Sequence, residues 1–191
     1  IISGFFGKFI GDRNSEILTS VLVSISALLS IHVLYQVIVN QYEENIVIAT
    51  WISSGSLDVN WSMLIDPLSA VMLVVVTSVS ALVHIYSIGY MSHDPHKPRF
   101  MAYLSLFTFA MLMLVTSDNF IQLFFGWEGV GLCSYFLIGF WFKKDTANSA
   151  AIKAFLVNRG GDFGFALGIF LIFYLFGTVN YSEVFELIPT I

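Results

Sequence analysis

A series of apolar stretches, each long enough to cross a lipid bilayer, most constrains what this chain can fold into. The stretch 17–39 holds no lysine, arginine, aspartate or glutamate, and at ~1.5 Å per helical residue it matches a hydrocarbon layer of about 30 Å. Charged residues make up 11% of the chain, whereas soluble domains contain roughly 25%. The sequence therefore predicts one integral membrane domain over residues 1–191.

Turn and cap residues divide the chain into about six helical spans. Asn14 or Ser15 is expected to cap the second span, and Asp66 before Pro67 begins the third. Residues 117–119 are expected to form a tight turn and cap before the fifth span, and Gly177 ends the last. The predicted spans lie near residues 1–9, 16–39, 66–90, 99–116, 119–142 and 147–176. The first is incomplete, and because the chain opens without methionine we expect a fragment or processed piece of a longer protein.

The last predicted span, 147–176, is too long for a bilayer. It would measure ~45 Å if straight, so we expect it to tilt, protrude or bend, and Gly160-Gly161 is the expected place of a bend. Residues 182–187 after it are expected to form a short surface helix.

The connection 40–65 predicts β structure outside the membrane. The β-prone runs 46–52 and 57–61 flank a polar turn, 53–56. Trp51 and Trp61 fit the interfacial belt, where amphipathic rings settle. The predicted fold class is therefore all-α, a polytopic transmembrane helix bundle of five or six spans with a short external β-hairpin between spans two and three.

Lysine and arginine are distributed unevenly among the loops. Alternate loops and their flanks hold six of them, namely Lys8, Arg13, Lys97, Arg99, Lys143 and Lys144. The loops 40–65, 117–118 and 177–191 hold none. Since positive loops stay on the cytoplasmic or matrix side, the hairpin is predicted to lie outside and the loop 91–99 inside.

A few formal charges fall inside the predicted spans, and they are the candidate functional residues. They are Glu128, Lys153, Arg159 and Asp162. A charge at this depth costs several kcal/mol and is rarely there without a task or a partner. Apolar surroundings favour a protonated carboxyl group, and a nearby cation favours the ionised form. An acid whose cationic neighbour approaches or withdraws can therefore hold and release a proton.

Structural interpretations of the same residues stay open. Glu128 can simply pair with Arg159 or Lys153 and tie two helices together. Arg159 and Asp162 lie three residues apart and can pair on one helix face. His84 can extend a proton relay through bound water, or it can be a hydrogen-bonded packing histidine.

The sequence gives no support for a disulfide, a metal site, a dinucleotide-binding site or a nucleic-acid-binding surface. The single cysteine, Cys133, excludes an internal disulfide and a CxxC metal site, and no glycine pattern for dinucleotide binding is present. The loop histidines His93 and His96 lack a second ligand pair, so we predict no metal site. A net charge of -5 gives no basic surface for nucleic acid.

Several runs resemble a known family and together cover essentially the whole chain. They lie at 66–69, 84–87, 99–104, 126–140 and 151–162. The most specific are WEGVGLCSY at 127–135 and RGGD at 159–162. On these residues the chain resembles subunit 5 of proton-pumping NADH:quinone oxidoreductase, respiratory complex I.

The resemblance implies an antiporter-like membrane subunit, of which this chain is the N-terminal part. In that family the acid matching Glu128 is the helix-5 glutamate of a proton channel, and the acid matching Asp162 lies near subunit boundaries and the channel entrance. The glutamate pairs there with a lysine on helix 7. Lys153 and Arg159 are not that lysine, which would lie beyond this chain.

The resemblance also implies where the remaining chemistry occurs. No cofactor is expected in this chain, and NADH, FMN, iron–sulfur clusters and quinone are expected in other subunits. The expected partners are other membrane subunits of complex I and the lipid bilayer, in a bacterial inner membrane or a mitochondrial inner membrane. Two alternatives stay open, a subunit of the related cation/proton antiporters and a helical scaffold whose acids only bind neighbours.

The predicted topology can be tested at the hairpin turn. In the full-length protein, a Ser54→Cys variant should react with a membrane-impermeant thiol reagent added from the outer side, because the turn lies among loops without basic residues. Reaction only from the inner side would reverse the topology.

Overall fold

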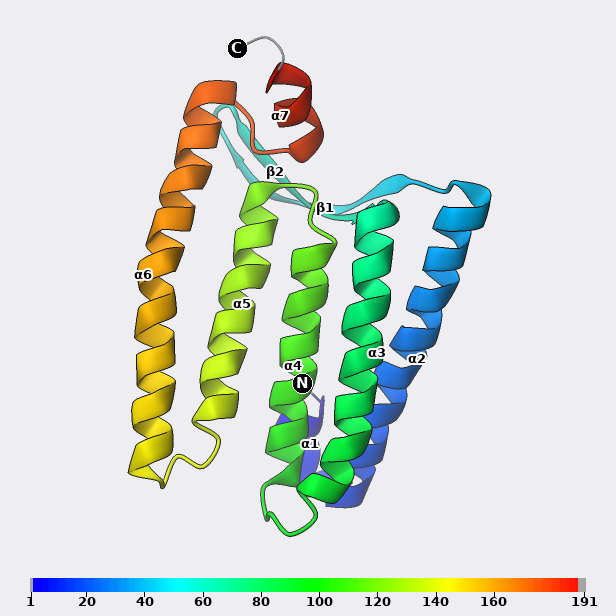
Figure 1. Ribbon diagram of the computed structural model, residues 1–191, viewed down its shortest axis with the longest axis vertical. Coiled ribbons are helices and arrows are strands. Elements are labelled where there is room, and N and C mark those ends of the chain that lie inside the picture. Colours follow the sequence, from blue (N-terminus) through cyan, green and yellow to red (C-terminus); the bar gives the residue numbers. More distant parts are fainter. Residues whose placement is uncertain (1, 189–191) are drawn as a thin grey trace.

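Long helices stand side by side in the computed structural model, which describes residues 2–188 without the side chains of Ile2 and Lys8. Across Figure 1 the order is α6, α5, α4, α3 and α2, with α1 at the foot of the bundle. The elements are α1 (Ile2–Ile10), α2 (Asp12–Asn40), β1 (Glu44–Ser54), β2 (Leu57–Ile65), α3 (Pro67–Tyr90), α4 (Lys97–Val115), α5 (Phe120–Ile138), α6 (Asp145–Phe176) and α7 (Tyr181–Leu187).

The predicted fold class is confirmed. Within residues 2–188, five helices, α2 to α6, are long and apolar enough to cross a membrane. Helix α1 has 9 residues, about 14 Å at 1.5 Å per residue, which is too short to span. One antiparallel hairpin, β1 with β2, joins α2 to α3.

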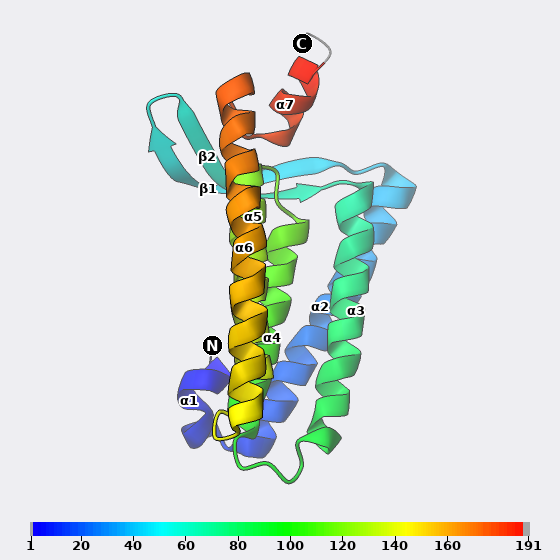
Figure 2. The same cartoon turned by 60° about the vertical axis from the view of Figure 1, so that its left-hand side comes forward.

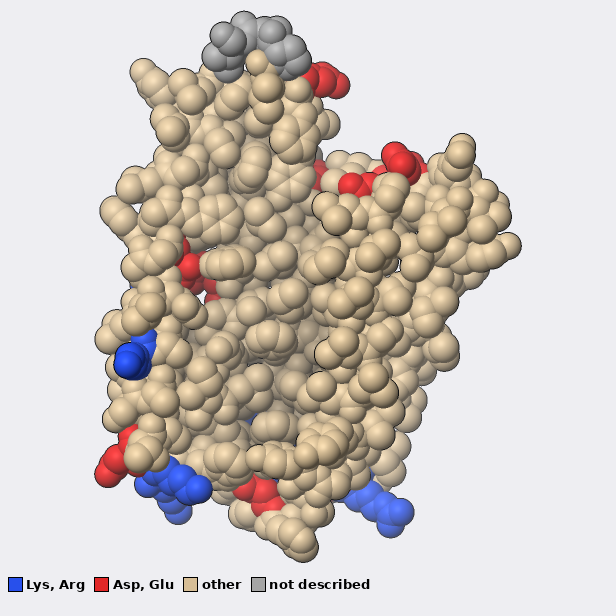
Figure 3. Space-filling view, in the orientation of Figure 1, with Lys and Arg blue, Asp and Glu red and all other residues tan. Residues whose placement is uncertain are grey.

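The loops with lysine or arginine lie at one end of the bundle, and the loops without them lie at the other end, as predicted. The connections after α1, α3 and α5 meet at the lower end of Figure 1, and the hairpin, the turn between α4 and α5, and α7 lie at the upper end. Figure 3 shows most of the visible Lys and Arg at the lower end, while Asp and Glu appear at the upper end, at mid-height on the left and at the lower end. We call the lower end, with Arg13, Lys97, Arg99, Lys143 and Lys144, the basic end.

Two predicted helix ends were wrong by several residues. Helix α2 begins at Asp12, because Gly11 adopts a positive φ of 85° and turns the chain directly out of α1. The predicted cap Asn14 is already helical, and its amide donates to the Ile10 carbonyl at 3.0 Å. Helix α5 ends at Ile138 rather than near residue 142, because Gly139 closes the helix and a turn follows.

Helix α6 protrudes instead of bending. It runs unbroken from Asp145 to Phe176 through the two glycines, since a helix is held by backbone hydrogen bonds that glycine supplies like any residue. Its upper part extends beyond α5 in both views (Figures 1 and 2). There Ile169 clusters with Val59 of the hairpin and Val179, all almost fully buried, so the hairpin covers one side of this part of α6.

The caps of α3 and α5 form as the sequence predicts. Asp66 accepts from the Ser69 N–H at 2.6 Å, and the Ser69 hydroxyl accepts from the Asp66 N–H at 2.8 Å. This reciprocal pair satisfies two backbone donors at the start of α3. Asn119 caps α5 by accepting from the Gln122 N–H at 2.8 Å.

A buried glutamine clamps the hairpin to α5. The Gln122 amide accepts from the Ser62 N–H at 2.9 Å and donates to the Ser62 carbonyl at 2.7 Å. It therefore pairs with β2 as a neighbouring strand would. The rings of Trp51, Trp61 and Phe125 pack edge to face beside this contact, with centroids 5.0 to 5.5 Å apart.

Helices α4 and α5 approach most closely at Gly126. A Cβ added there would lie 2.6 Å from the Leu114 nitrogen and 2.7 Å from its Cα. Backbone atoms cannot move aside as a flexible side chain can, so the glycine sets the distance between the two helices.

A substitution at this contact tests the packing. In the full-length protein, Gly126→Ala should lower the free energy of unfolding by about 1–3 kcal/mol, because the added methyl group overpacks a backbone contact. The measurement is thermal stability in detergent. Gly131→Ala on the same helix is the matched control, since nothing lies within 4 Å of its added Cβ. Equal destabilisation by both variants would contradict the proposed close contact.

Candidate functional site

An ion pair joins α5 to α6 near the middle of both helices. Arg159 Nη1 of α6 contacts Glu128 Oε2 of α5 directly. The Arg159 guanidinium also lies over the Phe155 ring, 4.5 Å from its centroid, which holds the cation in a fixed direction. The structure therefore brings together the acid and the base that the sequence placed on separate spans.

A second acid completes the site. Asp162 Oδ2 lies 4.0 Å from Arg159 Nη1, and Asp162 Oδ1 accepts from the indole Nε1 of Trp127 at 2.8 Å. Asp162 is 8% exposed. We call Glu128, Arg159 and Asp162 the charged triad. When all three are ionised, two carboxylates share one guanidinium, and the triad carries one negative charge in excess.

An open hollow adjoins the charged triad between α5 and α6. Its volume is about 790 Å³, and the polar groups of Ser134, Asn158 and Asp162 line it together with Trp127. A water molecule occupies about 30 Å³ of liquid. The hollow therefore has room for water, and it reaches the carboxylate of Asp162 from the side.

Lys153 does not join the charged triad. It lies six residues before Arg159 on the same helix, about 9 Å lower along the axis, and it is exposed. Arg159 takes the contact with Glu128 that Lys153 was also predicted to make. Within the described part of the chain, Lys153 has no hydrogen bond or ion pair.

His84 lies apart from the triad, fully buried between α3 and α4. Its Nδ1 is 2.8 Å from the Ser80 carbonyl oxygen, and its Nε2 is 3.1 Å from Ser105 Oγ of α4. The Ser80 hydroxyl also contacts Thr108 Oγ1 at 2.5 Å. Helix α4 stands between α5 and α3, the helix that carries His84, in Figure 1. The described contacts therefore place His84 and Glu128 in two separate polar groups.

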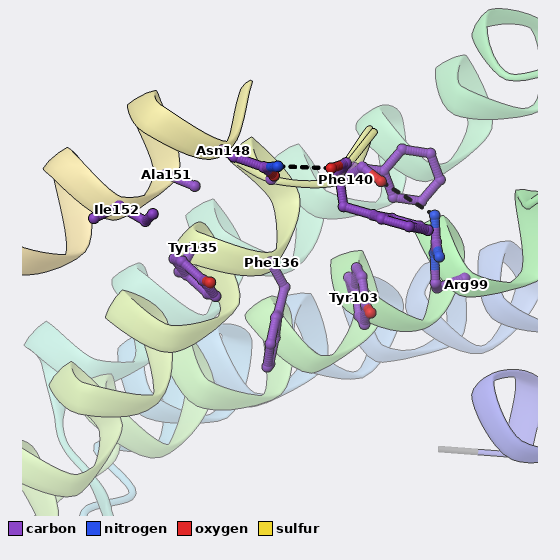
Figure 4. Close-up of a pocket in the computed structure, with 10 residues that line it drawn as sticks. Arg99, Tyr103, Tyr135, Phe136, Phe140, Asn148, Ala151 and Ile152 are labelled. Atoms are coloured by element: carbon purple, nitrogen blue, oxygen red, sulfur yellow. Dashed lines mark hydrogen bonds between the residues drawn. The ribbon is translucent and has the colours of Figure 1, made fainter. Parts of the chain in front are cut away.

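A second hollow, of about 500 Å³, lies at the basic end among aromatic side chains. In Figure 4, Tyr103 and Phe136 line it, and their rings stack with centroids 5.2 Å apart. The Arg99 guanidinium donates to the Phe140 carbonyl at 3.1 Å, and Asn148 donates to the Phe142 carbonyl at 2.6 Å. These bonds join α4 and α6 to the loop between α5 and α6.

Two of the basic-end loops, the one after α3 and the one after α5, are also linked through Asp94. Trp141 Nε1 donates to Asp94 Oδ2 at 2.9 Å. Burial acts to raise the pKa of Asp94, but the hydrogen bonds from Trp141 and the His96 N–H, with the charges of His96 and Arg99, bring the pKa below its ordinary value. Asp94 therefore stays ionised and keeps its bond to Trp141 at neutral pH.

Two known protein families match parts of this sequence. The family described as NADH-ubiquinone oxidoreductase (complex I), chain 5 N-terminus, matches residues 51–101. The family described as NADH:quinone oxidoreductase/Mrp antiporter, TM, matches residues 117–190. The second match includes the whole charged triad, and the first includes His84.

Curated relatives agree with both matches. NADH-ubiquinone oxidoreductase chain 5 of Triticum aestivum is 58% identical over 184 residues, which cover 96% of this chain and 28% of the relative. The NADH-quinone oxidoreductase subunit L of Rickettsia bellii is 49% identical over 189 residues, covering 99% of this chain and 29% of the relative. The chain belongs to the complex I chain 5 family. It spans somewhat more than a quarter of the length of these relatives.

Solved structures share the fold of this chain 5 family member. A chain of the Mrp complex from a Dietzia species superposes with a TM-score of 0.79 at 24% identity, covering 96% of this chain and 19% of that chain. A chain of the archaeal membrane-bound sulfane sulfur reductase superposes with a TM-score of 0.81 at 20% identity, covering 96% and 37%. The helix arrangement is therefore shared among membrane complexes with different chemistry.

The sequence did not reveal the role of Trp127. It stands next to Glu128 and turns its indole N–H toward the other acid, Asp162. The available signal was an indole beside an intramembrane carboxylate, since the N–H of a tryptophan held away from water needs an acceptor. Which of the two acids it meets depends on the packing of α5 against α6, which spacing along one chain does not give.

The Trp127–Asp162 bond can be measured by a double-mutant cycle in the full-length protein. Trp127→Phe and Asp162→Asn should show a coupling energy of about 1–2 kcal/mol in thermal unfolding, because a hydrogen bond to a buried carboxylate is lost. Trp141→Phe with Asp94→Asn is the matched control, and its coupling should be smaller because the bond between these two side chains is exposed, whereas Asp162 is 8% exposed. Zero coupling at Trp127 would show that the bond contributes nothing.

Proposed function

We propose that this chain is the N-terminal part of a proton-translocating membrane subunit of NADH:quinone oxidoreductase, the respiratory complex I. The single observation that carries the proposal is the charged triad, placed mid-way along helices long enough to span a bilayer. The whole complex would oxidise NADH, reduce a quinone and move protons outward, while this chain carries no redox centre of its own.

The charge of the triad supports proton handling. Two acids facing one arginine leave one negative charge in excess, and an apolar layer disfavours such a charge. A proton on one carboxyl group, or a further cation from another segment, removes the excess. A cation that approaches and withdraws would therefore bind and release a proton at Glu128 or Asp162.

The further cation is expected from the remainder of the full-length subunit. The resemblance to the chain 5 family implies a lysine on helix 7, which lies beyond residues 1–191. In this chain Arg159 is the triad's cation, and an arginine stays protonated under all working conditions. Arg159 therefore disfavours a proton on the acids that it contacts, and it cannot carry one itself.

The proposed setting follows from the same family membership. The subunit would lie in a bacterial or mitochondrial inner membrane, beside other membrane subunits, with NADH, FMN, iron–sulfur clusters and quinone bound elsewhere in the complex. A cation/proton antiporter subunit is the second candidate, because one matching family includes Mrp antiporters and a chain of an Mrp complex shares the fold. The relatives at 49% to 58% identity named for NADH oxidoreductase favour the first.

Removal of the titratable group of Glu128 tests the proposal in the intact complex. Glu128→Gln keeps the size of the side chain but cannot release a proton, so turnover of NADH with quinone and proton pumping should fall together, by about tenfold or more. Both rates are measured in reconstituted vesicles. Glu43→Gln, an exposed acid at the end that carries the hairpin, should leave both rates unchanged. Full pumping and turnover in Glu128→Gln would make Glu128 a structural residue.

A further inference from the structure

The hollow at the basic end, which we call the basic-end hollow, is lined by a cation without an acid partner. That cation is Arg99. Both ion pairs among the described residues belong to Arg159, so within this part of the chain no carboxylate contacts the Arg99 guanidinium. Asp94 lies close enough to interact with its charge, but the Asp94 oxygens bond to the His96 N–H and the Trp141 indole. A partly buried cation without a paired anion is unfavourable, so Arg99 favours an anion from outside this chain segment.

The Arg99 guanidinium is held in a fixed position. Its central carbon lies 4.7 Å from the centroid of the Phe140 ring and 5.2 Å from that of Phe142. Nη2 donates to the Phe140 carbonyl at 3.1 Å, and Nε is enclosed without a partner. Among the described residues Nη1 makes no hydrogen bond, and unlike Nε it is not fully enclosed. The N–H groups left on Nη1 and Nη2 therefore suit a phosphate, which a planar guanidinium binds through parallel hydrogen bonds.

The lining of the basic-end hollow changes from polar to apolar with depth. Helix α4 begins at the basic end, so Tyr103 lies about 6 Å further into the membrane than Arg99. Helix α6 also begins there, so Ile152 lies about 6 Å further in than Asn148. Figure 4 shows Arg99 and Asn148 bonded to the loop after α5, with the rings of Tyr103 and Phe136 beside them. A phospholipid has the same order, with its phosphate at the membrane surface and its acyl chains inside.

Two tyrosines bring hydroxyl groups without partners to the same hollow. Tyr103 and Tyr135 line it, and neither hydroxyl makes a hydrogen bond within the described residues. A tyrosine hydroxyl held away from water usually has a partner. The ester carbonyls of a phospholipid follow the phosphate along the molecule, and a carbonyl accepts from a hydroxyl. The tyrosines thus fit the part of a phospholipid that lies next to its phosphate.

The basic-end hollow has the size of a ligand site and an apolar rim. Its volume of about 500 Å³ falls within the roughly 300–1,000 Å³ of ligand pockets. Phe142 and Ile152 line it and are 52% and 50% exposed. Large apolar side chains beside an opening favour an apolar occupant over water. An acyl chain at the membrane surface has this chemistry.

The loops beside the basic-end hollow carry an excess of positive charge. The loops 91–99 and 139–146 hold four cations and two acids, namely Lys97, Arg99, Lys143 and Lys144 against Asp94 and Asp145. Lysine and arginine close to the inner membrane surface attract anionic lipids. The charge therefore favours an anionic phospholipid over a zwitterionic one.

We propose that the basic-end hollow binds one anionic phospholipid of the inner leaflet. Its phosphate contacts Arg99, its ester carbonyls accept from Tyr103 and Tyr135, and one acyl chain passes Phe136 and Ile152 toward the middle of the membrane. The lipid supplies the anion that Arg99 lacks, and it joins α4, the end of α5 and the start of α6. The site is separate from the charged triad, so it does not depend on the proposed proton translocation.

Photolabelling of the intact complex in detergent tests this proposal. The probe is phosphatidylglycerol with a photoactivatable diazirine in one acyl chain, and mass spectrometry identifies the labelled peptides. Labelling around Phe136 and Ile152 should saturate, and excess unlabelled phosphatidylglycerol should abolish it. Phosphatidylcholine, whose headgroup also carries a cation, should need a concentration about tenfold higher, and inorganic phosphate should not compete. Leu28, 68% exposed on α2, is the control for unspecific lipid contact, and both phospholipids should affect its labelling equally.

A substitution in the same complex tests the contact with the phosphate. Arg99→Gln should reduce the saturable labelling about tenfold, because a charge-assisted hydrogen bond is lost. Arg13→Gln is the matched control, since Arg13 is exposed at the same end and does not line the hollow, and it should label normally.

Four results would each overturn the proposal. The first is a lack of saturable labelling in the unaltered complex, which would show that another protein segment fills the hollow. The second is equal competition by the two phospholipids, and the third is displacement by inorganic phosphate, which would show a site for a free ion. The fourth is normal labelling of Arg99→Gln. If this variant fails to assemble, the competition in the unaltered complex still decides.

Discussion

Polar groups in a hydrocarbon layer must find their partners within the protein, and this constraint governs the whole structure. Backbone groups meet it by forming helices, and the serine and threonine hydroxyls in the spans mostly bond to carbonyls one turn back. Charges meet it by pairing between helices, as Glu128 does with Arg159. The hairpin, whose backbone is not helical, lies at the end of the bundle beyond most of the helix length (Figure 1).

Much of the fold could be predicted because its signals are local. The length of the apolar stretches predicted the spans. Asp66 and Asn119 predicted two helix starts, and Gly177, which has a positive φ of 73°, predicted a helix end. The start of α2 and the end of α5 were missed, because Gly11 and Gly139 act through the backbone angles of a turn. The clamp between Gln122 and the hairpin was also missed, because it joins residues 60 positions apart.

The candidate site was predictable in its members but not in its connections. Intramembrane charges are rare enough to identify Glu128, Arg159 and Asp162 from sequence. Which cation contacts Glu128 depends on the position of each cation along the axis of α6. Arg159 lies about 9 Å closer to the upper end of α6 than Lys153 does. His84 could have extended this relay or only packed between helices, and its contacts to Ser80 and Ser105 place it between α3 and α4 in a polar group separate from Glu128. Contacts between helices follow from packing, which periodicity along one helix does not determine.

The hydrogen bonds between Gln122 and the hairpin fix α5 near its upper end. Gln122 is bound to the hairpin backbone, and four residues later Gly126 lies against α4. Glu128 is about 9 Å from Gln122 along the axis, whereas Ile138 is about 24 Å away. If α5 swings about its held end, the displacement at Ile138 is about 2.7 times that at Glu128. The ion pair would then lie closer to the fixed end than the basic-end loops do, so a movement of those loops would change the separation of Glu128 and Arg159 by a smaller amount.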